Sequence, residues 1–262
     1  MRILIGIVLL LITTSSFATT FEGKFIQGSF ILGKTEPGSE VFIDKKKVKV
    51  TPDGYFAFGL SRDRKNDVVI TIDKKKIVKK VFKRKYNIQR IDGLEEKKVT
   101  PPEEVYERIK RENKWIGEAR AIESNLTFFT KKFIIPVEHV IISGVYGSQR
   151  ILNGKPKWPH YGLDFAADEG TKIKAMLDGT VTLAEPDLFY TGGTLIFDHG
   201  HGISTLYMHM EKILVKKDQK VKQGDIIGTV GSTGRATGAH LDVRLNWFQT
   251  RLDPATVLDI NN

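Results

Sequence analysis

The chain has no cysteine among its 262 residues. A disulfide framework, a thiolate metal site and a cysteine nucleophile are therefore excluded. Any metal ion must be held by histidine, aspartate or glutamate. Histidine is also scarce, and all six histidines follow residue 125. We therefore expect the chemistry of this protein in the C-terminal half.

No apolar run in the sequence is long enough to be a typical membrane span of about 20 residues. The first residues combine Arg2, an apolar run from Ile3 to Ile12, and the small residues Ser16 and Ala18. This pattern predicts a signal peptide over residues 1–18, cut after Ala18. An uncleaved anchor is the alternative, but the apolar run is short for one. We expect a periplasmic or otherwise exported protein without a stable membrane span after cleavage.

The net charge of +10 is unevenly distributed, because most of the basic excess precedes residue 125. A basic face favours an anionic partner such as a wall polymer or a membrane surface. A solvated, lysine-rich surface is the plainer interpretation and explains the composition equally well. Nucleic acid is not expected as a partner of an exported chain.

The pattern of short apolar stretches and turn residues predicts a mainly β protein. Residues 19–98 alternate between apolar runs and turns such as Pro37-Gly38 and Asp53-Gly54, which is typical of a small β-sandwich-like domain. Residues 99–125 are expected to form a linker helix, started by Pro101 and Pro102. Residues 126–262 return to short strands with glycine-rich turns and form the second domain.

Two short motifs place polar side chains on common strand faces. His160 and Asp164 are four residues apart, so in an extended chain they point the same way, with Gly162 leaving space between them. His240 and Asp242 likewise share a face. One imidazole and one carboxylate that converge form half of a zinc site. His209 lies in a third strand and is assigned a functional role in the company of these motifs, whereas His199 and His201 are assigned to a hairpin turn.

At this point the sequence resembles the lysostaphin-type (LytM-like) zinc metallo-endopeptidases. The segments that carry the resemblance occur in the family's order: VYGSQR, HYGLD, AMLDGTV, HGHGISTLYMHM, VKQGDIIGTVGSTGRATGAHLDVR and LDP. The resemblance covers roughly residues 140–258. It implies a compact antiparallel β domain with a groove, and hydrolysis of stem-peptide or cross-bridge bonds of peptidoglycan through a metal-bound water.

The resemblance also assigns roles to individual residues. His160 and Asp164 match the first two zinc ligands, and His209 and His240 match the two catalytic histidines. The third ligand of the family is the second histidine of an HxH pair, and this sequence has Asp242 there. Aspartate is an accepted zinc ligand. We therefore expect one Zn²⁺, or another divalent metal, at His160, Asp164 and Asp242.

The aspartate leaves two further interpretations open. Two carboxylates and one imidazole neutralise Zn²⁺, so the cation should acidify water less than in the family's usual site. The first alternative is a catalytically inactive module that binds peptidoglycan or activates an amidase, with other cell-wall hydrolases as partners. The second, a carbohydrate-binding or adhesive β protein with incidental histidines, would hold no metal.

Overall fold

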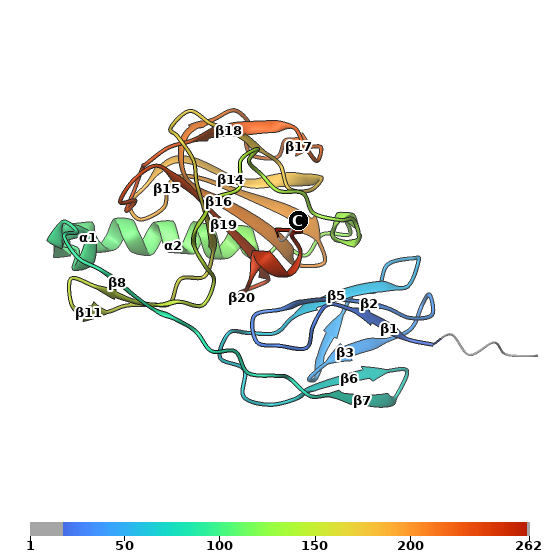
Figure 1. The fold of residues 1–262 in the computed structure, drawn as a ribbon. Coiled ribbons are helices and arrows are strands. Elements are labelled where there is room, and N and C mark those ends of the chain that lie inside the picture. Colours follow the sequence, from blue (N-terminus) through green and yellow to red (C-terminus); the bar gives the residue numbers. More distant parts are fainter. Residues whose placement is uncertain (1–17, 261–262) are drawn as a thin grey trace, which may run out of the picture.

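The computed structural model describes residues 18–260 and confirms a mainly β protein (Figure 1). The expected signal peptide lies, apart from Ala18, outside the described residues. Within residues 18–260, no helix has the length and apolar character needed to cross a membrane.

The N-terminal part consists of two small sheets that enclose an apolar core. Turns at Asp44-Lys45 and Asp73-Lys74 have positive φ angles and join consecutive antiparallel strands tightly. Ile31, Phe56 and Ile70 are fully buried in the core. One sheet has the order β1-β2-β5 and the other β4-β3-β6-β7. Their bounds are β1 Thr20–Glu22, β2 Phe30–Lys34, β3 Val41–Ile43, β4 Lys46–Val48, β5 Tyr55–Gly59, β6 Val68–Ile72 and β7 Lys75–Lys79.

The next strand, β8 (Ile88–Ile91), pairs with neither N-terminal sheet. It runs parallel to β10 (Gln149–Leu152), which also pairs with β11 (Lys155–Pro156). A segment that the sequence groups with the N-terminal strands therefore joins a small sheet with the C-terminal half. Alternation of apolar and polar residues identifies a strand, but it does not determine which other strand it pairs with.

The connection between the two halves is helical. It contains α1 (Glu96–Val99), the 3-10 turn η1 (Glu103–Val105) and α2 (Tyr106–Arg120), followed by η2 (Phe128–Thr130). The expected linker helix is thus present, and its α-helical part is shorter than residues 99–125. Ala119, with Trp115 and Ile116 beside it, packs against Ile196 and Leu206 of the large sheet. The helix therefore covers part of one sheet face.

The C-terminal half is built on a ten-stranded antiparallel sheet. Its main path is β17-β14-β15-β16-β19-β12-β9, and β13, β18 and β20 attach beside it. The face away from α2 contributes Tyr207, Val243 and Leu245 to the main core. The bounds are β9 Ile142–Gly144, β12 Leu163–Ala166, β13 Lys172–Lys174, β14 Gly179–Leu188, β15 Gly192–Gly200, β16 Ile203–Ile213, β17 Lys220–Val221, β18 Ile226–Val230, β19 His240–Trp247 and β20 Thr250–Leu252, with η3 at Pro254–Thr256.

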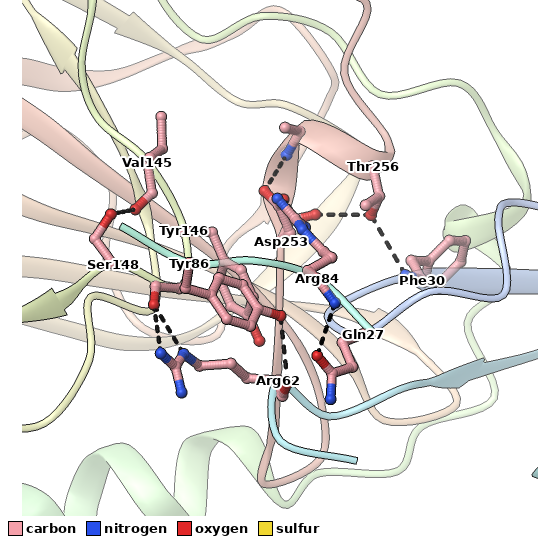
Figure 2. A network of polar contacts seen from close by, with 12 residues as sticks. Gln27, Phe30, Arg62, Arg84, Tyr86, Val145, Tyr146, Ser148, Asp253 and Thr256 are labelled. Carbon is pink, nitrogen blue, oxygen red and sulfur yellow. Dashed lines mark hydrogen bonds and ion pairs between the residues drawn. The ribbon is translucent and has the colours of Figure 1, made fainter. Parts of the chain in front are cut away.

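Polar contacts tie the N-terminal part to the C-terminal sheet (Figure 2). Arg84 Nη1 lies 2.6 Å from Oδ2 of Asp253, whose side chain is 4% exposed. Arg62 donates from Nε and Nη2 to Gly147 O at 2.9 and 2.7 Å. The backbone amide of Phe30 donates to Thr256 Oγ1 at 3.3 Å. The two halves therefore share an interface that includes the turn preceding β10.

Candidate metal and catalytic site

Asp164 lies in β12, and His160 lies three residues before that strand begins. The amide of His160 donates to Ser148 O, and its carbonyl accepts from the amide of Gly147, so the backbone before the strand is fixed. His160 Nε2 lies 3.0 Å from Asp164 Oδ1. Both side chains are buried. The structure thus brings the first predicted pair together where β12 begins.

Asp242 reaches the same point from β19. It is the cross-strand partner of Asp164, so both carboxylates leave the sheet on one face. Asp242 Oδ2 lies 3.4 Å from His160 Nε2. A Cβ placed on Gly162 would overlap Asp242 Oδ1, and one placed on Gly144 would overlap Asp164 Oδ2. These two glycines leave the space that the carboxylates occupy.

These three side chains fit a divalent cation. Their ligand atoms lie within 4.8 Å of one another, and all three residues are buried. Two ligands that are each 2.0–2.1 Å from a tetrahedral zinc ion are about 3.3 Å apart, close to the His160–Asp242 separation. Asp164 Oδ1 is buried, and its polar neighbour His160 Nε2 at 3.0 Å does not form a well-directed hydrogen bond with it. A buried carboxylate oxygen that no donor fully satisfies is suited to a cation.

Two arginines flank the carboxylates. Arg244 donates from Nη2 to Asp242 Oδ2 at 3.0 Å and from Nε to Oδ1 at 3.3 Å. Arg150 Nη2 lies 3.7 Å from Asp164 Oδ2. Burial acts to raise the pKa of Asp242, but Arg244 and His160 outweigh it and hold this pKa well below the ordinary value. Asp242 is therefore ionised at neutral pH, as a metal ligand must be.

His209 and His240 form a second pair beside the carboxylates, with ring centroids 4.8 Å apart. His209 Nδ1 lies 2.8 Å from Thr233 O, and His240 Nδ1 lies 2.8 Å from Gly238 O. Because a carbonyl only accepts, each Nδ1 carries the proton, and each neutral ring has its lone pair on Nε2. The glycine-rich segment between β18 and β19 thus fixes the tautomer of both histidines with its backbone oxygens.

The two histidines come from different backbone environments. His209 has a φ of 63° at an irregularity in β16, where the register with β18 shifts after Met210. Burial lowers the pKa of His209 to about 4; nearby Asp242 acts to raise it, and His240 lowers it further. His240 opens β19 and is only partly buried.

His199 and His201 have structural partners elsewhere. His199 Nδ1 contacts Asp178 O at 2.7 Å, and Nε2 contacts Thr205 Oγ1 at 2.8 Å. His201 lies in the turn after β15, with its ring 4.8 Å from that of Phe129. Neither belongs to the group of potential metal ligands.

The sequence pattern did not identify Arg150 as a neighbour of Asp164, because the two residues lie on strands of different sheets, β10 and β12, and meet only in the folded chain. The sequence does contain a signal that predicts the Arg244–Asp242 contact. The two residues are at i and i+2 of one strand, and such residues share a face.

The segment that holds this site is similar to known proteins. Residues 158–254 match the model of peptidase family M23. The peptidoglycan DD-endopeptidase ShyA of Vibrio cholerae is 45% identical over 87 residues, which are 33% of this chain and 20% of that protein. The DD-carboxypeptidase/endopeptidase Mpg of Neisseria meningitidis is 39% identical over 89 residues, again 33% of this chain and 20% of that protein. The chain thus spans about a fifth of the length of these curated relatives.

Similarity to one solved structure extends over most of the chain. A putative M23 peptidase from Pseudomonas aeruginosa matches with a TM-score of 0.65 and 28% identity. The match covers 89% of this chain and 95% of that one. The arrangement of the N-terminal sheets, the helix and the large sheet is therefore shared with that protein.

Proposed function

We propose that this chain, whose residues 158–254 match the model of peptidase family M23, is an exported peptidoglycan endopeptidase that cleaves stem-peptide or cross-bridge bonds. The observation that carries the proposal is the convergence of His160, Asp164 and Asp242 beside the His209–His240 pair. The relatives named as peptidoglycan DD-endopeptidases support this substrate class.

We propose His160, Asp164 and Asp242 as the ligands of one Zn²⁺ or another divalent ion. Such a cation polarises a scissile carbonyl and lowers the pKa of water. Arg244 supports the ligand set by orienting the Asp242 carboxylate, in the way that ligating carboxylates are commonly held by outer hydrogen bonds. Arg244 and Arg150 also offset the two negative charges, so the centre keeps more positive charge than its ligands alone would allow.

We assign proton transfer to His209 and His240. With each Nδ1–H donated to a backbone carbonyl, Nε2 of a neutral ring is free to take a proton from the attacking water. That ring, once protonated, donates the proton from Nε2 to the leaving amine. The other histidine can hydrogen-bond the developing oxyanion only in its protonated form, because a neutral ring has no second N–H to offer.

We place the protein in the cell envelope, with residues 126–262 as the peptidase unit, residues 19–98 as an N-terminal β domain and residues 99–125 as the connection. Peptidoglycan is the proposed partner. The strands around the site come from distant parts of the chain. We therefore propose that the full chain after residue 18 is the active form.

A second candidate function is a catalytically inactive module that binds peptidoglycan or activates another wall hydrolase such as an amidase. One observation favours it: Asp242 has two ionic partners within the protein itself, Arg244 and His160. In that case the carboxylates would form a closed ion-pair network, and cleavage would be absent.

The test is the release of soluble muropeptides from purified sacculi by residues 19–262 with zinc supplied. Products are identified by mass spectrometry, and their masses name the bond. Asp242→Ala is compared with Asp92→Ala, an exposed aspartate after β8. Release by the native chain and the Asp92→Ala control but not by Asp242→Ala supports the peptidase. No release by any of the three, with all of them folded, supports the module that does not cleave.

A further inference from the structure

Three arginines gather on the side of β19 and β20 that carries Asp242, two from these strands and one from α2. Arg251 of β20 is the cross-strand partner of Asn246 on β19, and Asn246 lies two residues after Arg244. Cross-strand partners share a face, as do alternate residues of a strand. Arg251, Asn246, Arg244 and Asp242 therefore point to the same side of the sheet. The opposite side carries Leu241, Val243 and Leu245, each 0% exposed.

The third arginine comes from the end of α2. Arg120 is 5% exposed, and its Nη2 donates to Phe248 O at 3.2 Å in the turn between β19 and β20. Its Nε has no hydrogen-bond partner within residues 18–260. Burial, together with the charges of Arg251 and Arg244, lowers the pKa of Arg120 to about 9. The helix thus adds a third positive charge to the strip.

The carboxylates of the described chain do not balance this charge. Arg244 pairs with Asp242, but no described carboxylate is within ion-pair distance of Arg120 or Arg251. Arg251 instead stacks on the ring of Tyr161, with its guanidinium carbon 4.7 Å from the ring centroid. Partly buried like charges repel one another, and the arrangement becomes favourable when an anion lies between them.

We propose that Arg251 and Arg244, reinforced by Arg120, form a subsite for a carboxylate of the stem peptide beside the bond to be cleaved. The inference rests on the proposed function for the identity of the ligand. Guanidinium groups match carboxylates through parallel N–H···O bonds, which lysine does not offer. Stacking on Tyr161 holds Arg251 in place, so less side-chain freedom is lost on binding.

The position of the subsite limits which carboxylate of the stem peptide can bind there. Arg244 Nη2 is 3.0 Å from Asp242, one of the proposed metal ligands. A carboxylate bound to this strip therefore belongs to a residue adjacent to the scissile bond. Two groups of a stem peptide meet this condition: the free C-terminal carboxylate and the side-chain carboxylate of a diamino diacid residue. Their chemistry is shared, and amidation distinguishes them.

The experiment measures binding separately from hydrolysis. The chain from residue 19, carrying His240→Ala, is titrated calorimetrically with a purified tetrapeptide stem. The same peptide is tested amidated at its C-terminus, and again amidated at the diacid side chain. Amidation of the recognised carboxylate is expected to weaken binding about 10- to 100-fold, the range for losing hydrogen bonds to a charged group. The amidated peptide that binds more weakly identifies which of the two carboxylates the arginines recognise.

Variants then test the arginines. In Arg251→Met, the affinities for the free peptide and for the amidated peptide are expected to differ by less than about threefold. Arg251→Lys is expected to restore part of this difference in affinity. Arg111→Met is the matched control, since Arg111 also stacks on an aromatic ring, that of Trp115, but is exposed on α2. It should keep the full difference. Thermal unfolding of each variant confirms that it is folded.

Three results would overturn the subsite: equal binding of both amides and the free peptide, no binding of any of them at millimolar concentration, or full discrimination by folded Arg251→Met. If the chain binds the free carboxylate selectively but releases no muropeptides, the proposed peptidase activity is wrong and the proposed subsite is still supported.

Discussion

The carboxylate of Asp242 is held between two cations or potential cations, with Oδ2 3.4 Å from His160 Nε2 and 3.0 Å from Arg244 Nη2. The third ligand position of the proposed metal site is therefore occupied by a residue whose orientation and ionisation are already fixed. Histidine at this position would need no arginine partner. Asp242 and Arg244 thus act as a pair, and we expect replacement of the aspartate to affect metal binding first.

Asp242→Ala should lower zinc affinity by at least about 100-fold, since loss of an outer partner alone typically costs 10- to 100-fold. Competition with a fluorescent chelator measures the affinity. Asp92→Ala should bind zinc as the native chain does. Unchanged affinity in Asp242→Ala would show that this carboxylate is not a ligand.

Gly162→Ala should also weaken zinc binding, although it removes no ligand. A Cβ at residue 162 would overlap Asp242 Oδ1 and lie 2.9 Å from Val243 O, so the carboxylate must move away from His160. We expect a loss of zinc affinity of about 10-fold or more. The control is Gly117→Ala in α2, where a Cβ has nothing within 4 Å. That substitution should leave zinc binding intact and raise stability by up to about 1 kcal/mol.

The buried His199 should make stability depend on pH. Burial lowers its pKa in the folded chain to about 4, from an ordinary value of 6.5. Between these values the unfolded chain binds the proton and the folded chain does not, so stability rises with pH from about 4 to 6.5 and is lost as pH falls. One such group contributes a slope of up to about 1.4 kcal/mol per pH unit.

His199→Asn removes this titration while keeping a donor for Asp178 O. Urea unfolding at several pH values between 4 and 7 should give a shallower dependence than in the native chain, by about one proton. His209, whose pKa burial also lowers to about 4, leaves a residual slope. The exposed His139 serves as control, and His139→Asn should reproduce the native slope. An unchanged slope in His199→Asn would contradict the prediction.

The interface in Figure 2 should stabilise the whole chain through Arg84. Arg84→Met leaves the buried Asp253 carboxylate without its ionic partner at 2.6 Å, although Ala255 N still donates to it at 2.9 Å. We expect a loss of about 1–3 kcal/mol in the free energy of unfolding. A double-mutant cycle with Asp253→Asn checks it: independent, additive effects would mean that the pair contributes no coupling.

The sequence contains enough information for the mainly β fold and for most of the candidate site. Alternation of apolar and polar residues identifies strands wherever one face is buried. The spacing His240-x-Asp242 places both residues on one face of β19. His160 lies before β12, so its contact with Asp164 also depends on the backbone hydrogen bonds of His160 to Gly147 and Ser148. The absence of cysteine limits the ligands to histidine and carboxylates. These conclusions depend on local geometry, which the sequence determines directly.

The remaining features depend on contacts between segments that are distant in the sequence. Asp164 opposes Asp242 because β12 pairs with β19 in one register. β8 pairs with β10 and with no N-terminal strand among the described residues. Arg120 approaches the turn between β19 and β20 because apolar residues of α2 pack on the large sheet. A local pattern specifies which side chains share a face, but only the packed chain decides which faces meet, and so only the tertiary structure brings the arginines to the site.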